Sequence, residues 1–515
     1  MSSDTTSSPD PEIVAIYPDP VAENDQGEFV ELIVHSSTSS LVLRDDEGAV
    51  AVSNTTVQGR VQIALDSSKP PPTDGAQTVG TNGTLSLANT GERLELVADG
   101  RVVDVVTYEN ARSGERYINT DDGWEWRPRG ATDLPVVESS SARATLYAFP
   151  GGTEPVARSL KSATDRILLA GYTFSDPQIT TLLIEAHRRG VTVELLLDGG
   201  PVGGMLKRQA RQLDRLVAAG VTVHMLGGEH ARYRFHHAKY AVVDESAIIL
   251  TENWKPAGVG SRSSRGWGTT IKDRQIAAGL TELFRADSSW NDSQSWSRYR
   301  RTASFEPSDP IGDRYDRTVD PQSVRPNRTR LLVGPENAAH TLRGALSNAT
   351  TSIRVVQVSI GGPDGPFTTA AIAAARRGVS VRILLSSEWY VRDENRAMAA
   401  QLNRRANRSD LDLRVKLADP RGRFEKIHAK GVIIDSDTVM LGSLNWNQNA
   451  AQNNRELLVA MEGKTVGQYY TAIFDADWNG EDTHPLPVGA LVVLVILTVI
   501  ALWIARRISF EGRSE

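Results

Sequence analysis

The chain has 515 residues, a formal net charge of −6 and no cysteine, and this length predicts about three domains rather than one core. Hydrophobic residues at 40% and charged residues at 23% exclude a globally disordered protein. The negative charge argues against a protein that coats nucleic acid, and the missing cysteines exclude disulfides, thiolate zinc sites and cysteine nucleophiles.

Residues 11–137 have the pattern of an all-β domain. Short alternating runs such as Phe29–Val34 and Leu94–Val97 are separated by Gly, Asn and Asp turns, which is typical of a β-sandwich. The order of four segments resembles a lamin-tail domain: Ile13–Pro18, Gly27–Leu32, Leu85–Asn89 and Val102–Asp104. That resemblance implies an immunoglobulin-like β-sandwich that binds a partner of unknown identity.

After a Ser-rich stretch at 138–141, strands alternate with amphipathic helices, which indicates α/β units. Two segments, Ala186–Val193 and Ala375–Val381, each combine a basic helix end, a Gly stop and a β-branched strand. Their glycines are 378 − 190 = 188 residues apart, close to the 428 − 237 = 191 residues between two later histidines. The nearly constant offset predicts a duplicated domain. The predicted bounds are 143–295 and 328–478, with a solvated linker at 296–327.

The pattern His-x-Lys-x4-Asp occurs once in each copy, at His237, Lys239 and Asp244 and at His428, Lys430 and Asp435. Both patterns lie in apolar, β-branched runs and are predicted on strands, where residues two apart share a face. The histidine and the lysine therefore project together. The acid is seven positions from the histidine, an odd number, so both aspartates are predicted to support the structure rather than to catalyse.

A second element follows each pattern, at Leu250–Trp254 and at Leu441–Trp446. Both runs end in Asn-Trp, with a hydroxyl residue two positions before the Asn. Ammonium, amide and hydroxyl groups can all donate hydrogen bonds to phosphoryl oxygens. The predicted phosphate-binding residues are Lys239, Lys430, Asn253, Asn445, Thr251 and Ser443. The two tryptophans are predicted to pack beneath the site.

These repeated motifs resemble those of the phospholipase D superfamily. The resemblance implies two α/β halves that form one pseudo-twofold unit with the site at their junction. It also implies cleavage of a phosphodiester without metal or cofactor, through a covalent phosphohistidine that water or an alcohol resolves. By that analogy His237 is the nucleophile and His428 the general acid.

One departure concerns the carboxylate that orients the histidine ring in many family members. Glu456 supplies it about ten residues after the Asn of the second copy, whereas Gly266 stands at the matching place in the first copy. Either another group partners His237 or the first half is the weaker one. The nucleophile and acid roles therefore stay interchangeable at this point.

Other candidate groups are not repeated in the same way. The remaining histidines have no repeat partner and no metal-ligand spacing, and are predicted to be surface or core residues: His35, His187, His224, His230, His236, His340 and His484. Two basic stretches, Arg232–Arg234 and Arg421–Lys426, are predicted either to attract anionic substrates or to be solvated loops.

Residues 488–505 form an uninterrupted apolar run followed by Arg506 and Arg507, and are predicted to be a transmembrane helix. The positive-inside rule places the arginines in the cytoplasm and the body of the protein outside. The polar stretch 1–10 shows no signal peptide, which conflicts with export. Either an upstream export signal is missing or the chain is tail-anchored facing the cytoplasm. Asn-x-Ser/Thr sequons mildly favour export: Asn54, Asn82, Asn291, Asn327, Asn348 and Asn407.

Three functions from different classes remain. The first is a membrane-anchored phosphodiesterase that hydrolyses or transfers phosphatidyl groups, favoured by the paired motifs and the anchor. The second is a nuclease of the same superfamily. The third is a degenerate adhesion or scaffold protein, to which the incomplete first copy gives some weight. The intact His, Lys and Asn of both copies argue against the third function.

Overall fold

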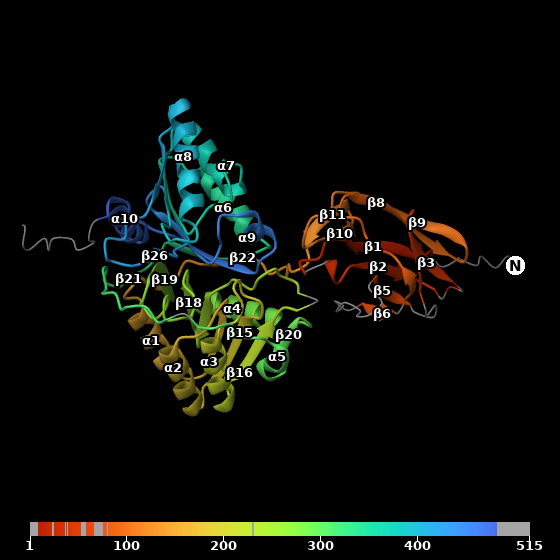
Figure 1. The fold of residues 1–515 in the computed structure, drawn as a ribbon, viewed down its shortest axis with the longest axis horizontal. Coiled ribbons are helices and arrows are strands. Elements are labelled where there is room, and N and C mark those ends of the chain that lie inside the picture. The colour runs from red at the N-terminus through yellow and green to blue at the C-terminus, as the bar shows by residue number, and fades with distance from the viewer. Residues whose placement is uncertain are drawn as a thin grey trace, which may run out of the picture.

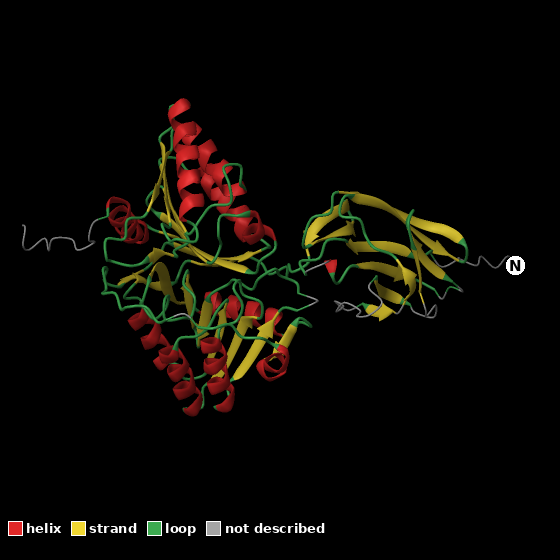
Figure 2. Ribbon diagram, in the orientation of Figure 1, coloured by secondary structure: helices red, strands yellow, loops and turns green. Residues whose placement is uncertain are grey.

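The computed structural model describes residues 9–22, 25–36, 38, 40–52, 58–65, 76–79, 81–228, 231–308 and 310–480. A β-domain lies at one end of the molecule and two α/β halves are stacked at the other (Figure 1, Figure 2). The predicted membrane span at 488–505 lies outside these ranges. Within them, no helix combines the length and the apolar character needed to cross a bilayer.

The β-domain is a sandwich of two sheets, as the alternating pattern predicts. One sheet has the order β11-β10-β1-β2-β5-β6 and the other the order β7-β4-β3-β8-β9. Apolar residues from both sheets share one core, among them Val30, Leu43 and Leu96. The strands are β1 (Glu12–Tyr17), β2 (Phe29–Val34), β3 (Leu41–Arg44), β4 (Ala49–Val52), β5 (Gly59–Ala64), β6 (Gln77–Val79), β7 (Thr81–Thr84), β8 (Gly91–Ala98), β9 (Arg101–Glu109), β10 (Glu115–Thr120) and β11 (Gly123–Pro128).

The first α/β half alternates strands and helices before it ends in an antiparallel section. Its strands are β13 (Arg143–Phe149), β14 (Arg166–Gly171), β15 (Thr192–Asp198), β16 (Thr222–Leu226), β17 (Tyr240–Val243), β18 (Ser246–Leu250), β19 (Ser264–Lys272) and β20 (Ser293–Ser295). Its helices are α1 (Thr153–Lys161), α2 (Pro177–Arg188), α3 (Lys207–Ala218), α4 (Arg274–Ser288) and α5 (Trp296–Thr302).

The second half repeats this order. Its strands are β22 (Arg328–Gly334), β23 (Ser352–Gln357), β24 (Ser380–Leu385), β25 (Leu413–Leu417), β26 (Lys426–Ile427), β27 (Gly431–Ile434), β28 (Thr438–Gly442) and β29 (Glu456–Glu462). Its helices are α6 (Ala338–Asn348), α7 (Pro366–Arg376), α8 (Arg392–Arg408), α9 (Gln448–Gln452) and α10 (Lys464–Asn479).

Sheet topology confirms the duplication. The order β16-β15-β14-β17-β18-β19-β13 in the first half is matched by β25-β24-β23-β27-β28-β29-β22 in the second. Helices α1–α3 and α6–α8 cover the outer faces of the two sheets, each over its own apolar core. Helices α4 and α10 lie between the sheets, and residues of both halves share a third core there. The two halves are therefore one packed unit.

The predicted linker at 296–327 is wrong in part, because two of its segments belong to the folded body. Helix α5 buries Trp296 in the core of the first half. Strand β21 (Gln322–Val324) pairs with β13 of the first half, although it directly precedes the second half. Strand β12 (Val137–Ser139), which directly precedes the first half, pairs with β22 of the second. The two halves thus exchange edge strands.

Strand direction places the two histidine motifs at one edge of each sheet. Strands β14 and β15 are parallel, and β17 is antiparallel to β14 with Ala170 opposite Tyr240. His237 and Lys239 lie in the segment just before β17, and His428 and Lys430 just before β27, rather than on the strands as predicted. The first pair is therefore at the carboxyl end of β14. The pairing of β23 with β27 repeats this arrangement for the second half. Loops that leave the carboxyl ends of the parallel strands surround both motifs, which is where α/β sheets usually bind ligands.

Candidate active site

The two motifs are held by backbone hydrogen bonds that cross between the halves. The N–H of His237 donates to the carbonyl of Arg455 over 2.9 Å, and the N–H of His428 donates to the carbonyl of Arg265 over the same distance. The backbone of each half therefore positions the histidine of the other half. The site exists only because the halves are packed together.

His237 is bound by a carboxylate of the second half. Its Nδ1–H donates to Glu456, whose two oxygens lie 3.0 and 3.1 Å away. Burial, partly offset by Glu456, lowers the pKa of His237 to about 4. The ring is therefore neutral near pH 7, and a proton on Nδ1 leaves a lone pair on Nε2. This is the state that a nucleophilic imidazole requires.

His428 is bound more loosely by a carboxylate of the first half. Its Nδ1 lies 3.3 Å from Glu252 Oε2 without a well-aligned hydrogen bond. Burial and the cations around it, Lys430 first among them, lower the pKa of His428 well below its ordinary value. Burial raises the pKa of Glu252 to about 7, so the ionised and the protonated carboxyl group are both populated near neutral pH.

Glu252 corrects the expectation that the first half lacks an orienting acid. Gly266 pairs with Phe149 as Glu456 pairs with Gly334, so the two positions are equivalent. A Cβ atom on Gly266 would lie 2.3 Å from both Cγ and Oε1 of Glu252. The side chain of Glu252 therefore fills the space that an acid at position 266 would need. The first half therefore carries its carboxylate at a different sequence position, but the carboxylate still lies beside a motif histidine, His428.

The two lysines complete a buried cationic pair. Lys239 and Lys430 are at most 1% exposed, and each ammonium donates to the carbonyl of the histidine two positions before it. Burial and then the charge of Lys430 lower the pKa of Lys239 well below its ordinary value. Burial lowers the pKa of Lys430 to about 8, against the attraction of Glu252. Their mutual repulsion creates a site that favours an anion between them.

The predicted phosphate-binding residues fall into two groups. Asn253 is buried and Asn445 is half-buried at the ends of the strands beside the lysines, and no hydrogen-bond partner is found within the described ranges for Asn253 Oδ1. Thr251 and Ser443 instead accept hydrogen bonds from the backbone N–H groups of Trp267 and Leu457, at 2.9 and 2.8 Å. Both hydroxyl residues are completely buried. They are placed to hold the strands together, whereas the amides are the better candidates for phosphate contact.

Asp244 and Asp435 are structural supports, as side-chain parity predicts. Asp244 accepts hydrogen bonds from the backbone N–H groups of Thr164, Asp165 and Arg166. Asp435 does the same for residues 350–352. Although burial opposes it, these donors lower the pKa of both aspartates. Each aspartate fixes the loop that enters the central strand of its half, β14 or β23.

Each basic stretch contains one arginine that is a buried anchor rather than a substrate-facing cation. Arg232 binds Asp292, and Arg423 binds Asp477, at 3.0 and 2.9 Å. Both arginines are less than 9% exposed, so neither predicted role applies to them. Only the outer residues of these stretches, such as Arg234, reach solvent.

Two completely buried arginines behind the site were not singled out from the sequence. Arg455 binds Asp287 and Glu336, and it reaches Thr132 in the segment that follows the sandwich. Arg265 binds Asp477, the carbonyl of Phe149 and Thr318 of the segment between the halves. Their separation of 455 − 265 = 190 residues matches the repeat offset, which is the signal that could have identified them.

Tyr172 and Glu252 are further groups at the site that sequence reasoning missed. The ring of Tyr172 meets the ring of His237 edge to face, with centroids 4.9 Å apart, and lies 5.3 Å from the Lys239 ammonium. The only sequence signal for Glu252 is its place next to Asn253, after an apolar strand. Trp254 and Trp446 are buried beneath the site, as predicted.

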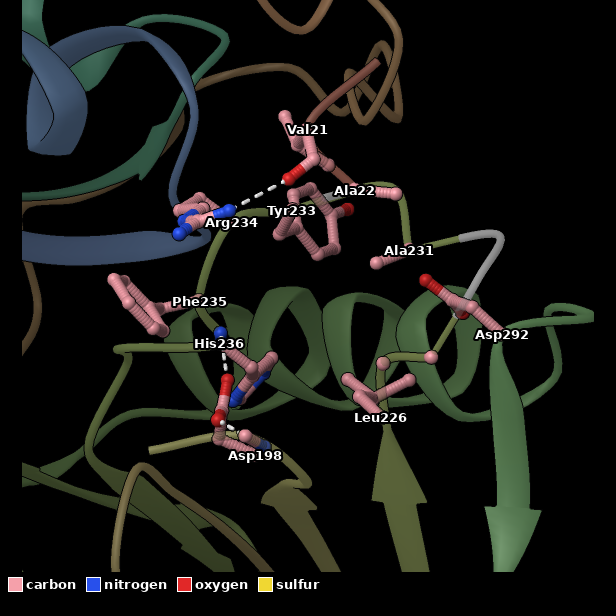
Figure 3. Close-up of a pocket in the computed structure, with 13 residues that line it drawn as sticks. Val21, Ala22, Asp198, Leu226, Ala231, Tyr233, Arg234, Phe235, His236 and Asp292 are labelled. Atoms are coloured by element: carbon pink, nitrogen blue, oxygen red, sulfur yellow. Dashed lines mark hydrogen bonds between the residues drawn. The ribbon is translucent and has the colours of Figure 1, made fainter. Parts of the chain in front are cut away.

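The other histidines follow the prediction where the structure describes them. His35 and His340 are exposed, His187 and His224 are half-buried, and His236 is in the core; His230 and His484 lie outside the described residues. His236 faces a cavity of about 290 Å³ beneath Val21 of the sandwich (Figure 3). The backbone N–H of His236 donates to Asp198 over 2.6 Å, and the Arg234 side chain donates to the carbonyl of Val21 over 3.0 Å. Among the described residues, no cluster of three or more His, Asp or Glu could hold a metal ion.

A pair of histidines, each beside a carboxylate from the opposite half and flanked by a buried lysine, lies at the junction of two equivalent halves. The family model for the phospholipase D-like domain of cardiolipin synthase matches residues 156–288 and 342–478, just over half of the chain. The chain therefore belongs to this family, within the phospholipase D superfamily of phosphodiesterases and transferases. No family is assigned to the β-sandwich, and its lamin-tail resemblance stays a prediction.

Relatives match parts of this chain. A phospholipase D from Rickettsia felis is 30% identical over 135 residues, 26% of this chain and 63% of that protein. A mitochondrial cardiolipin hydrolase from Canis lupus familiaris is 25% identical over 152 residues, 30% of this chain and 54% of that protein. The chain thus spans less than two thirds of either relative.

Solved structures that match this chain include a phosphatidylserine synthase from Haemophilus influenzae. It is 12% identical with a TM-score of 0.49, and the match covers 73% of this chain and 95% of that one. Nuc, a phospholipase D family member from Salmonella typhimurium, is 20% identical with a TM-score of 0.26, over 31% of this chain and 98% of that one.

Proposed function

We propose that this protein is a membrane-anchored phosphodiesterase that hydrolyses or transfers phosphatidyl groups through a phosphohistidine on His237. The observation that carries the proposal is the crossed pair of acid–histidine contacts, Glu456 to His237 and Glu252 to His428. An enzyme that splits a phosphodiester needs one imidazole as nucleophile and another as proton donor. The crossed contacts hold both imidazoles at one junction.

In the first step, Nε2 of His237 attacks phosphorus, so that a P–N bond forms and the P–O bond to the head-group alcohol breaks. His428 donates its proton to the departing oxygen. An incoming phosphodiester is an anion, so it raises the pKa of His428 and supplies the protonated form that this role needs. Lys239 and Lys430 stabilise the negative charge that builds up on the phosphoryl oxygens.

In the second step, His428 accepts a proton from water or from an alcohol, whose oxygen attacks phosphorus. The P–N bond breaks and His237 is regenerated with its lone pair. Water gives the phosphatidic acid and an alcohol gives a new phosphodiester. The ionised Glu456 stabilises the positive ring of the intermediate. Burial tends to raise the pKa of Glu456, but His237 and neighbouring donors outweigh burial and lower this pKa.

The assignment of His237 as the nucleophile is supported by the difference between the two acid contacts. Two oxygens of Glu456 lie within 3.1 Å of His237 Nδ1, whereas Glu252 lies 3.3 Å from His428 and titrates near neutral pH. A nucleophilic ring has to carry a positive charge through a covalent intermediate, so it gains more from a permanently ionised partner.

Phospholipid as substrate is supported by two observations outside the site. The curated relatives carry the names phospholipase D and mitochondrial cardiolipin hydrolase, which refer to lipid substrates. The apolar run 488–505 with its basic flank is long enough to hold the site at a bilayer. The proposal places the body on the extracytoplasmic side, where the lamin-tail-like sandwich binds a partner of unknown identity.

The test uses the full chain in detergent micelles, with phospholipid and single-stranded DNA as alternative substrates and EDTA in the buffer. We expect metal-independent release of head group from phospholipid, and its loss in the His237→Ala variant. His340→Ala, a change at an exposed histidine, is the matched control and keeps the activity. Cleavage of DNA alone contradicts the lipid assignment. Activity that needs a divalent metal, or that survives loss of both motif histidines, contradicts the mechanism. Protease accessibility on intact cells tests the orientation.

A further inference from the structure

We propose that two protruding apolar side chains, Val202 and Trp389, dock the mouth of the active site onto a lipid–water interface. Both are 77% exposed, whereas the other exposed large hydrophobic side chains of the described residues range from 39 to 46%. The proposal rests on the proposed function, because it names the surface at which that site works.

The two side chains occupy equivalent places in the two halves. Val202 lies in the loop that follows β15, and Trp389 lies in the loop that follows β24. Strands β15 and β24 hold the same position in their sheets, next to β14 and β23. Their carboxyl ends lie at the edge from which His237 and His428 emerge. The pseudo-twofold relation therefore sets one apolar tip on each side of the catalytic pair.

The first tip is connected directly to the catalytic groups. The backbone N–H of Val202 donates to the hydroxyl oxygen of Tyr172 over 2.6 Å. The same tyrosine packs edge to face against the ring of His237. The Tyr172 side chain therefore contacts both the tip and the proposed nucleophile.

The second tip reaches the other catalytic pair through its neighbour. The ring of Tyr390 packs against Trp389 with centroids 5.7 Å apart, and the Lys426 ammonium lies 5.8 Å from the Tyr390 ring. Burial and nearby carboxylates, including Glu252, raise the pKa of Tyr390 to about 12. Tyr390 therefore lies near Glu252, the partner of His428.

A lipid surface fits these tips better than other occupants do. Single-stranded nucleic acid is bound by flat aromatic rings, and Val202 offers none. An interface with lipid accepts an aliphatic and an aromatic side chain equally, and Trp is favoured there. The charges of Lys255 and Lys426 act on Glu252, so both lysines lie near the mouth of the site. These cations would attract an anionic lipid surface.

The length of the chain beyond the described body agrees with this occupant. The described residues end at Gly480 and the apolar run begins at residue 488, which leaves seven residues, 481–487, between them. The eight Cα–Cα steps from residue 480 to residue 488 span at most about 28 Å. If the run is embedded in a bilayer, the body stays within that distance of the lipid surface.

The absence of cysteine from the chain allows a direct test with single labels. Val202→Cys, Trp389→Cys and the control Val102→Cys, at an exposed position on β9, are each made in the full chain with His237→Ala to prevent turnover. Each variant carries a polarity-sensitive thiol dye and is reconstituted into nanodiscs of phosphatidylcholine and phosphatidylglycerol. We expect brominated acyl chains to quench the dye at positions 202 and 389 at least about twofold more than at position 102. Equal quenching at all three positions, or a response at 202 and 389 only to single-stranded DNA, overturns the proposal.

A second measurement compares substrates in the otherwise native chain. Trp389→Ala and Val202→Ser should lower turnover of bilayer phospholipid by about tenfold and leave turnover of a soluble phosphodiester, bis(p-nitrophenyl) phosphate, unchanged. An equal loss on both substrates contradicts interfacial docking. If the protein cleaves neither substrate, the proposed function fails, and the quenching measurement still decides on the docking surface.

Discussion

The two halves of the α/β body present the same catalytic pair but support it differently. In the second half, Glu456 projects from its strand in the regular position and binds His237 with both oxygens. In the first half, the equivalent position is Gly266, and Glu252 reaches the same space from a neighbouring strand end. The site therefore requires a carboxylate at a place in space rather than at a position in the sequence. It also shows a cost, since the relocated acid is the less tightly bound and the more easily protonated of the two.

Removal of either histidine should have the largest effect. His237→Ala and His428→Ala should each lower kcat/KM on phospholipid by about 10⁴-fold, because no other side chain takes over the role of the lost nucleophile or proton donor. Substrates with a p-nitrophenolate leaving group separate the roles, since this group departs without a proton. The His428→Ala variant should regain most of the first step on that substrate, measured as a burst of p-nitrophenolate. A burst in the His237→Ala variant instead would exchange the two assignments.

The orienting acids should differ in the size of their effects. Glu456→Gln should lower kcat by about 10²-fold, because His237 loses a fully ionised partner at hydrogen-bonding distance, whereas Glu252→Gln should cost about tenfold. Steady-state kinetics at pH 7 measures both. Equal losses would show that the looser contact of Glu252 has no functional meaning.

An acid at position 266 tests whether Glu252 occupies the space of the regular carboxylate. Gly266→Glu alone should destabilise the fold by about 1–3 kcal/mol, because its side chain meets Glu252. The double variant Glu252→Leu with Gly266→Glu copies the second half, which has Leu444 and Glu456 at these places. It should regain stability and keep kcat within about tenfold of the native protein. A double variant as unstable as the single one, by thermal unfolding, would mean that the two acids do not share one space.

The pH profile of kcat/KM should reflect the ionisation of Lys430, the buried lysine of the second half. Lys430 becomes neutral as pH rises through its lowered pKa of about 8, so kcat/KM should fall above that pH. On the acid side, His237 should lose its lone pair only as pH falls through about 4. An arginine stays charged at these pH values, so Lys430→Arg should move the alkaline limb upward by more than one pH unit, even if the maximal rate drops. An unmoved limb would assign it to another group.

The aspartates of the motifs should give the smallest effect on catalysis. Asp435→Asn should lower the free energy of unfolding by about 1–2 kcal/mol, because backbone N–H groups at 350–352 lose an ionised acceptor. The specific activity of the folded fraction should change less than about threefold. The pKa of Asp435 is depressed in the fold, so its contribution is present above about pH 4 and is lost as pH falls below that value. A difference in stability that persists unchanged in acid would contradict this role.

The parts of the molecule that depend on periodicity could be predicted from the sequence. The alternating runs predicted the sandwich, and the fixed offset between repeats predicted two α/β halves with one site. Side-chain parity was enough to assign Asp244 and Asp435 to support. These features follow from local patterns that tertiary structure preserves.

The parts that depend on contacts between the halves could not be predicted. Nothing in the sequence around Glu252 indicates that its side chain crosses to His428, because the two residues are 428 − 252 = 176 positions apart. The buried role of Arg232 was missed for the same reason, since its partner Asp292 lies on a different segment. Strands β12 and β21 are three residues long, too short for a periodic signal, and pair with the half that does not adjoin them in sequence.

This exchange of edge strands has a mechanical consequence. The sandwich is followed in sequence by the first half, yet β12 joins it to the second through three residue pairs with β22. A force that pulls on the sandwich therefore loads β22, whose far end at Gly334 pairs with Glu456. A partner bound to the sandwich would transmit strain to the strand that aligns His237. After a cut in the chain at residues 140–142, the sandwich would still be paired with the second half through β12 and β22.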